Sequence, residues 1–285
     1  MLQNASEMLI RIAAFVVALA LVVASPSAAF ATGPHGAQRI VSLIPSLTED
    51  LFAIGAGQRV VGVSQFTDHP DAATRLQQVG SFSALDTEAI ARLHPDLIVG
   101  IPAQAPLVAD ARRIGLRVEL IPDDSFDDLF ASVARLGRLC DRDAAAGALI
   151  RRLRARTAAL VATVPRRSHP RTFVVLGVSP IFTVGDGSYI ADLIALAGGR
   201  NASGIATPYA RYSAEALLVA QPDAIVADKT SDLPAALARS PWNALRAVRA
   251  GRVFILDDAG ILERPGPRYN EGLAWLIARI HRGSR

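Results

Sequence analysis

Short apolar runs rich in Val, Ile and Leu alternate with stretches of helical spacing along most of this chain. The apolar runs lie at 39–44, 59–64, 96–101, 116–121, 172–178, 223–228 and 252–257. Helical patterns lie between them, near 47–54, 86–93, 104–114, 188–197, 213–219 and 268–281. Continuous apolar strands bounded by helices are typical of parallel sheets covered on both faces. The pattern therefore predicts an α/β fold with mostly parallel sheets.

One helix–strand unit is written twice in the chain. DTEAIARLHPDLIV (86–99) matches YSAEALLVAQPDAIV (212–226), and the match places Glu88 and Glu215 at equivalent positions. A second pair consists of LTEDLFAIGAG (47–57) and YIADLIALAGG (189–199). Both members of the second pair follow a strand and end in glycines of the kind that close helices. The repetition predicts two similar lobes.

The segment between the two halves has no β-rich run. Residues 141–165 are rich in Ala, Leu and Arg, begin with acidic residues and end at Pro165. These are features of a single helix with a defined start and stop. We therefore predict lobes at 38–140 and 166–285, joined by one long helix at 141–165. Such a helix is a stiffer connector than a Gly/Ser linker.

The first 31 residues have the three-part pattern of a secretory signal. Arg11 precedes an apolar run at 12–24, and AFA at 29–31 forms a cleavage pattern. A retained membrane anchor is the alternative, but the apolar run is shorter than the ~20 residues that a spanning helix needs. No cysteine lies near the cleavage position to accept a lipid. We expect residues 1–31 to be removed and the mature protein to be free in the periplasm.

Charge and cysteine content restrict the classes of partner. Cys140 is the only cysteine, so an exported chain holds together without intramolecular disulfides. The net charge is +4, but the densest basic run, at 151–156, would spread around a helix instead of lining one side. We therefore expect no nucleic-acid partner.

Motifs of enzymes and metal sites are absent from the sequence. G-x-S-x-G and the Walker loop do not occur, and the glycines at 55–57 end a helical pattern instead of opening one. The five histidines are isolated, so no metal site is expected. A secreted α/β enzyme with Asp68 or Asp258 as base remains an alternative, although no second catalytic group stands nearby. We expect a protein that is not an enzyme.

Aromatic residues stand beyond the ends of predicted strands. They are Phe66, Phe82, Phe182 and Tyr209, two in each predicted lobe. Ligands of open α/β sheets bind at the carboxyl ends of strands, where such rings offer flat stacking surfaces. Local loop packing would explain any one ring. Four rings in similar places predict a shared cleft for a large, rigid ligand.

Together these segments resemble the periplasmic substrate-binding proteins of ABC importers, of the type with two lobes and one long helix. The resemblance covers nearly all of 39–281. It rests on the order of RIVSLIPSLTEDLFAIGAGQRVVGVSQFTDHP, TEAIARLHPDLIV, PIFTVGDGSYIADLIALAGG, YSAEALLVAQPDAIV and ERPGPR. The chain is most similar to the cobalamin-binding members, with siderophore and haem binders as relatives.

The resemblance implies a set of ligand contacts. These are Ser46, Phe66, Phe82, Phe182, Tyr209 and Arg264, with Asp258 as an acidic neighbour. The family has an acidic residue where this chain has Gly260, and Asp258 stands two residues earlier. From the residues alone, Ser46 with Glu49 also forms a capping-box pattern, and the two roles are compatible.

The resemblance also implies a membrane partner. Glu88 and Glu215 match the glutamates with which the family docks against arginines of the permease, so we expect a monomer that meets a permease–ATPase complex in the inner membrane. A carboxylate in a first helical turn is also favoured by the helix dipole, by ~0.3–1 kcal/mol. That effect explains one glutamate but not an equivalent pair.

The sequence thus predicts a carrier that binds cobalamin or a related corrinoid and has no cofactor of its own. A ferric siderophore or haem is the alternative cargo. Haem would need an iron ligand such as Tyr209 or His69.

Overall fold

The computed structural model describes residues 36–166 and 168–282. The predicted signal at 1–31 lies outside the described residues. None of the helices in the described part combines the length and apolar character needed to cross a membrane.

The N-terminal lobe contains a five-stranded parallel sheet. Its order is β3 (Gln77–Gln78), β2 (Val60–Val63), β1 (Ile40–Ser42), β4 (Leu97–Gly100) and β5 (Val118–Leu120). β1, β2 and β4 are almost wholly buried, as their apolar sequences predict. The strand order reverses between β1 and β4, and such a reversal creates a crevice at the carboxyl ends of the strands.

Four α-helices belong to this lobe: α2 (Pro45–Ala53), α3 (Thr87–Arg92), α4 (Ala109–Arg113) and α5 (Phe126–Leu139). The sequence analysis missed α5. Ser125 starts it with a capping box, in which Ser125 Oγ accepts from Asp128 N and Asp128 Oδ2 accepts from Ser125 N. Its apolar face is buried through Leu129, Val133 and Leu136.

The C-terminal lobe has two sheets. The parallel one has the order β12 (Val253–Leu256), β11 (Ala224–Asp228), β6 (Arg171–Val175) and β9 (Arg200–Asn201). The other, which the sequence analysis did not predict, is antiparallel: β10 (Tyr209–Arg211), β8 (Ile181–Val184) and β7 (Gly177–Val178). The helices are α7 (Tyr189–Leu196), α8 (Ala214–Ala220), α9 (Leu233–Ala236), α10 (Arg246–Arg249), α11 (Gly260–Glu263) and α12 (Tyr269–Ile280).

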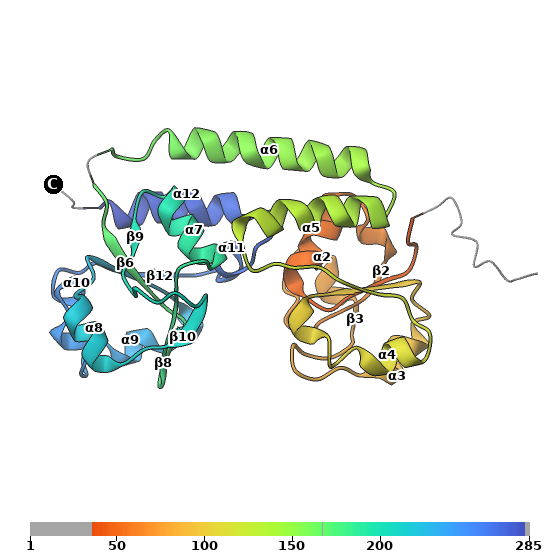
Figure 1. Ribbon diagram of the computed structural model, residues 1–285, viewed down its shortest axis with the longest axis horizontal. Coiled ribbons are helices and arrows are strands. Elements are labelled where there is room, and N and C mark those ends of the chain that lie inside the picture. The colour runs from red at the N-terminus through yellow and green to blue at the C-terminus, as the bar shows by residue number, and fades with distance from the viewer. Residues whose placement is uncertain (1–35, 167, 283–285) are drawn as a thin grey trace, which may run out of the picture. The chain divides into compact units, whose positions relative to one another are not determined.

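A single long helix, α6 (Asp143–Val161), connects the lobes and lies within the predicted connector 141–165. It runs alongside α5 of the first lobe and α12 of the second (Figure 1). At 1.5 Å per residue, its 19 residues span roughly 28 Å. The two-lobed α/β prediction is confirmed, and the exact lobe limits at 38–140 and 166–285 stay predictions.

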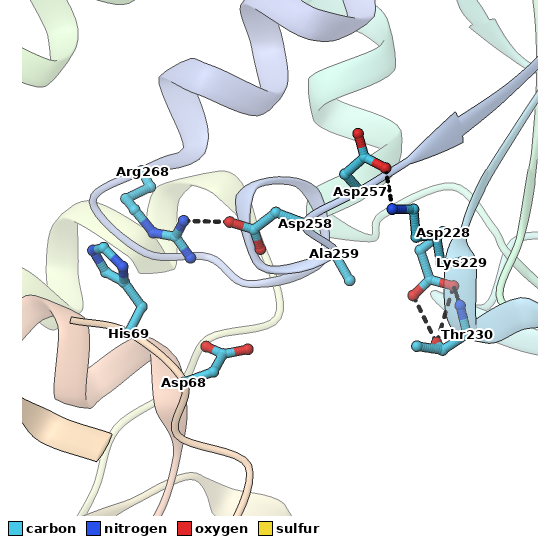
Figure 2. Close-up of a pocket in the computed structure, with 9 residues that line it drawn as sticks. All are labelled: Asp68, His69, Asp228, Lys229, Thr230, Asp257, Asp258, Ala259 and Arg268. Atoms are coloured by element: carbon cyan, nitrogen blue, oxygen red, sulfur yellow. Dashed lines mark hydrogen bonds and ion pairs between the residues drawn. The ribbon is translucent and has the colours of Figure 1, made fainter. Parts of the chain in front are cut away.

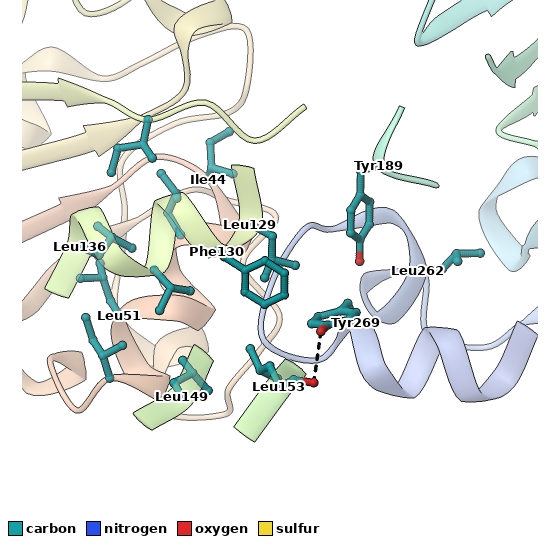
Figure 3. Packing of buried hydrophobic residues seen from close by; sticks show 14 of the residues in the cluster. Ile44, Leu51, Leu129, Phe130, Leu136, Leu149, Leu153, Tyr189, Leu262 and Tyr269 are labelled. Atoms are coloured by element: carbon teal, nitrogen blue, oxygen red, sulfur yellow. Dashed lines mark hydrogen bonds between the residues drawn. The ribbon is translucent and has the colours of Figure 1, made fainter. Parts of the chain in front are cut away.

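Tyr269, at the start of α12, joins the three long helices. Its ring packs edge-on against Phe126 and Phe130 of α5, with centroid distances of 5.2 and 6.2 Å. Its hydroxyl hydrogen-bonds Thr157 of α6, and the neighbouring Asn270 Nδ2 donates to Leu153 O at 3.1 Å. Figure 3 shows this ring near Phe130 and Leu153, within one apolar cluster that contains residues of both lobes. These buried contacts link the two lobes through α6 and α12.

The duplicated unit occupies the same place in each lobe. Asp96, just before β4, accepts hydrogen bonds from the backbone N–H groups of Gln38 and Arg39 at the entrance of β1. Asp223, just before β11, accepts from Arg171 N at the entrance of β6. β4 pairs with β1, and β11 pairs with β6. The repeated sequence therefore encodes a repeated structural unit, with a helix start at Glu88 or Glu215.

Cys140 closes α5 and is buried. Burial raises the pKa of its thiol to about 11. The thiol therefore stays protonated at neutral pH and is unreactive.

Candidate functional site

The predicted ligand rings are exposed although their lobes are well packed. Phe66 is 56% exposed, Phe82 49%, Phe182 37% and Tyr209 41%. Among the described residues, the only other large apolar side chains with such exposure are Ile114, Val161, Leu218 and Val219. Four of eight exposed apolar side chains are thus the rings chosen from the sequence. Their exposure leaves them accessible to a ligand, and their role as a shared binding surface stays a prediction.

Different elements hold the four rings. Phe66 follows β2, and its carbonyl oxygen accepts from Arg264 Nη2 of the other lobe at 3.3 Å. Phe82 stands in a tight loop closed by the bridge between Gly80 and Leu85. Phe182 and Tyr209 stand on β8 and β10, so they belong to the unpredicted antiparallel sheet and not to loops.

An ion-pair network crosses from lobe to lobe beside Phe66. The carboxylate of Glu49 on α2 has a side chain only 1% exposed and accepts from Arg268 Nε at 2.9 Å and from Arg264 Nη1 at 3.4 Å. Arg264 also donates to Asp68, with Nη2 2.9 Å from Oδ2. Arg268 donates to Asp258 at 2.6 Å. The network joins two carboxylates of the first lobe to two arginines of the second.

The expected capping box at Ser46 and Glu49 is wrong. Helix α2 has Ile44 as its N-cap and Pro45 as its first residue, and no side chain caps it. Glu49 instead turns to the arginines of the other lobe, because a carboxylate buried there needs cationic partners. Ser46 is 1% exposed, and its hydroxyl has no hydrogen-bond partner among the described residues. Gly266 of the other lobe lies against the Ser46 backbone, where a Cβ on Gly266 would lie 3.7 Å from Ser46 Cα.

Two further predicted contacts, Arg264 and Asp258, are engaged within the protein. Arg264 is held by Asp68 and Glu49, as described above. Asp258 Oδ1 accepts from Gly260 N at 2.9 Å while Oδ2 accepts from Arg268. Its side chain remains 48% exposed and lines a cavity.

That cavity has a volume of about 410 Å³ and is lined from both lobes. Asp68 and His69 come from the first lobe; the second supplies Asp228, Lys229, Thr230, Asp257, Asp258, Ala259 and Arg268. Figure 2 shows Arg268 pointing at Asp258 and Lys229 at Asp257. Within the described ranges no group of three His, Cys, Asp or Glu side chains could hold a metal ion, so His69 has no co-ligands there.

The sequence analysis missed two partly buried acids, Asp123 and Glu263. Burial, together with the charges of Asp124 and Asp128, raises the pKa of Asp123 to about 7. Burial and the neighbouring Asp228 raise the pKa of Glu263 to about 7. The only sequence signal was the Asp pair at 123–124 directly after a predicted strand.

The charges of both acids affect the pKa of Tyr209. Burial raises the pKa of the Tyr209 phenol to about 12, and the charges of Asp123, Asp124 and Glu263 add to the rise. Asp123 belongs to the first lobe and Glu263 to the second. Carboxyl groups of both lobes therefore contribute to the electrostatics of Tyr209.

Glu88 and Glu215 each lie in the first turn of an exposed helix. Asp86 caps α3 by accepting from Ala89 N, and Ser213 caps α8 by accepting from Ala216 N. Both glutamates are exposed. Glu88 lies 3.8 Å from Arg92, whereas Glu215 has no ion-pair partner in the described part of the chain.

Comparison with known proteins places these features in context. A sequence profile described as periplasmic binding protein matches residues 40–259. A vitamin B12-binding protein of Vibrio cholerae is 30% identical over 82% of this chain and 86% of its own. An uncharacterized ABC transporter substrate-binding lipoprotein of Bacillus subtilis is 26% identical over 86% of this chain and 80% of its own. The crystal structure of a periplasmic heme-binding protein from Pseudomonas aeruginosa has a TM-score of 0.76 and 28% identity, covering 87% of this chain and 94% of its own.

Proposed function

Because this chain belongs to the periplasmic binding protein family, we propose that it captures cobalamin or a related corrinoid in the periplasm and delivers it to an ABC permease. It is a substrate-binding protein of an ABC transporter, of the vitamin B12, haem or siderophore type, and its relatives are transport proteins and not enzymes. Export through the signal at 1–31 and a monomeric state are part of the proposal.

The exposed rings are the observation that carries the proposal. They offer four apolar faces, two from each lobe, to a cargo large enough to touch both. Rings fixed on a stiff two-lobed frame lose little freedom on binding, which favours affinity for a rigid macrocycle. A corrin ring has the size and rigidity that such a surface suits.

The charges around the rings favour a neutral cargo. Arg264 and Arg268 are already paired with Glu49, Asp68 and Asp258. Asp123 and Glu263 add carboxyl groups that would repel anions or donate to amide oxygens. Corrinoid side chains are uncharged amides, whereas haem propionates and many siderophores are anionic. Anionic groups of a ligand placed beside Arg264 and Arg268 would find no free cation there and would lose affinity.

Haem is further disfavoured by the chemistry of Tyr209. Tyrosine binds ferric haem as the phenolate. Burial and the charges of Asp123, Asp124 and Glu263 raise the pKa of Tyr209 to about 12, so this phenol offers no pre-formed phenolate, and the iron itself would have to displace the proton.

A ferric siderophore is the second candidate. Arg211 lines a cavity of about 430 Å³ beside Phe182, and no ion pair engages it within the described ranges. A guanidinium next to a ring suits an anionic chelate.

Titration calorimetry with cyanocobalamin, hemin and a ferric siderophore tests the choice of cargo. We expect cyanocobalamin to bind with a Kd below ~10 μM, equivalent to about −7 kcal/mol, and the others more weakly. Phe66→Ser with Phe182→Ser should weaken cyanocobalamin binding at least tenfold. Ile114→Ser, at an exposed side chain directly after α4, is the matched control. Tight hemin binding without cyanocobalamin binding would refute the corrinoid assignment.

The proposed docking residues are Glu88 and Glu215. Their support is that the two carboxylates start equivalent helices in the two lobes and are exposed. Glu88→Ala with Glu215→Ala should leave cyanocobalamin binding intact and abolish transport into proteoliposomes that hold the cobalamin permease–ATPase complex. Glu271→Ala, at an exposed carboxylate on α12, should transport normally. Normal transport by the double variant would remove the docking role.

A further inference from the structure

Helix α8 exposes apolar side chains next to its glutamate. Val219 is 85% exposed and Leu218 36%, and Val219 is the most exposed of the large apolar side chains in the described part. Residues three and four apart share one face of a helix, so both stand beside Glu215. We call Glu215, Leu218 and Val219 the α8 patch. A partner that contacts Glu215 could cover these two apolar side chains at the same time.

The equivalent helix of the first lobe lacks this patch. In α3 the position four residues after Glu88 holds Arg92, and the position three residues after it holds Ala91. Arg92 lies 3.8 Å from Glu88, so a cation of the protein itself already partly satisfies that carboxylate. The duplication has kept the glutamate and changed its neighbours.

Resting on the proposed docking to an ABC permease, we infer that the α8 patch provides most of the docking affinity. Its occupant is a permease loop that presents an arginine or lysine beside an apolar side chain. The cation pairs with Glu215, which has no ion-pair partner among the described residues, and the apolar side chain covers Val219 and Leu218. Excluding water around the ion pair strengthens it. α3 would then act mainly to fix the orientation.

Charge complementarity selects this occupant over two others. A second copy of the chain, packed patch to patch, would bring Glu215 against another Glu215 and leave both carboxylates unpaired. An anionic lipid surface would repel the same carboxylate. A permease loop with a cation meets both the acidic and the apolar parts of the patch.

The test measures the Kd of the cyanocobalamin-loaded protein for the cobalamin permease–ATPase complex of its own organism, held in nanodiscs. Covering a valine side chain is worth enough to change an equilibrium about tenfold. We expect Val219→Ser to raise the Kd about tenfold, and Glu215→Gln to raise it more than Glu88→Gln. Val161→Ser, at an exposed valine on α6, should leave it unchanged. Because Val219 is exposed, Val219→Ser should keep the wild-type melting temperature.

The outcomes separate this inference from the proposed function. If Val219→Ser binds within twofold of wild type, or if Glu88→Gln loses as much as Glu215→Gln, the inference is wrong. The docking proposal survives that result when Glu88→Gln with Glu215→Gln still abolishes binding. If the wild type binds no such complex, both fall. A wild-type dimer in sedimentation that Val219→Ser dissolves would assign the patch to a second copy and overturn the inference.

Discussion

Replacing Arg268 with methionine tests whether the buried carboxylate of Glu49 ties the two lobes together. Glu49 lies on α2 of the first lobe and Arg268 at the start of α12 in the second. Arg268 Nε and Nη2 lie 2.9 and 3.3 Å from the two Glu49 oxygens. The Glu49 side chain is 1% exposed and that of Arg268 14%. The variant removes both of these hydrogen bonds, together with the one to Asp258 at 2.6 Å, and keeps most of the apolar volume.

The expected loss follows from what remains around Glu49. Arg264 Nη1, at 3.4 Å, is then the nearest cation, and Asp68 competes for it. Removing one partner of a buried ion pair costs ~3–5 kcal/mol. Because Arg264 remains near Glu49, we expect the free energy of unfolding to fall by the lower end of this range, about 3 kcal/mol. For a chain of this size that corresponds to a fall in melting temperature of roughly 6–12 °C.

Urea denaturation followed by circular dichroism gives the free energy of unfolding. Arg113→Met is the control, because the Arg113–Asp110 pair is exposed by 77% and 68% and should cost less than ~1 kcal/mol. Glu49→Met with Arg268→Met removes both charges and should recover much of the loss. The reasoning is refuted if Arg268→Met costs no more than the control, or if the double variant is less stable than Arg268→Met.

Two further predictions concern the buried acids Asp123 and Glu263 and the contacts of Tyr269 between the lobes. Since folding raises the pKa of Asp123 and Glu263 to about 7, from ordinary values of 3.8 and 4.5, the folded state holds protons that the unfolded chain releases. The free energy of unfolding should therefore fall as pH rises from 5 to 7 and level off above pH 7. In Asp123→Asn with Glu263→Gln, the free energy of unfolding measured by calorimetry should depend less on pH over this range. A double variant with the same pH dependence as the wild type would contradict the prediction. Tyr269→Phe should lower the free energy of unfolding, measured by urea denaturation, by about 1 kcal/mol. The loss is small because Thr157 Oγ1 keeps Asn270 Oδ1 as a hydrogen-bond partner at 3.0 Å. Tyr269→Ala should cost ~3–5 kcal/mol through lost packing, and equal losses would refute the distinction.

Most of the fold could be predicted from the sequence because the apolar runs of strands are local patterns and one helix–strand unit is repeated. Each predicted apolar run contains a strand, and the duplicated helix–strand unit lies at an equivalent place in the two parallel sheets. The missed helix α5 had a local signal as well, the Ser125–Asp128 capping box. The antiparallel sheet was missed because its pairing joins residues as far apart as Phe182 and Arg211, which no local pattern shows.

The site was predicted less completely, because its chemistry depends on burial and on the opposite lobe. The four exposed rings could be named from the sequence, although Phe182 and Tyr209 stand on strands that were not predicted. Glu49 had a plausible local role as a cap, but contacts with Arg264 and Arg268 override it. The acidity of Asp123 and Glu263 depends on desolvation, which spacing along the chain does not reveal.

Because Cys140 is buried, this chain is convenient for labelling at introduced cysteines. Its thiol is buried, and the rise of its pKa to about 11 keeps it out of alkylation reactions at neutral pH. Cysteines introduced on surface positions of α4 and α10 would therefore take dyes alone, without first removing a native thiol. A donor and an acceptor placed in this way would record, in single molecules, how far the halves separate when cargo arrives and when the transporter takes it.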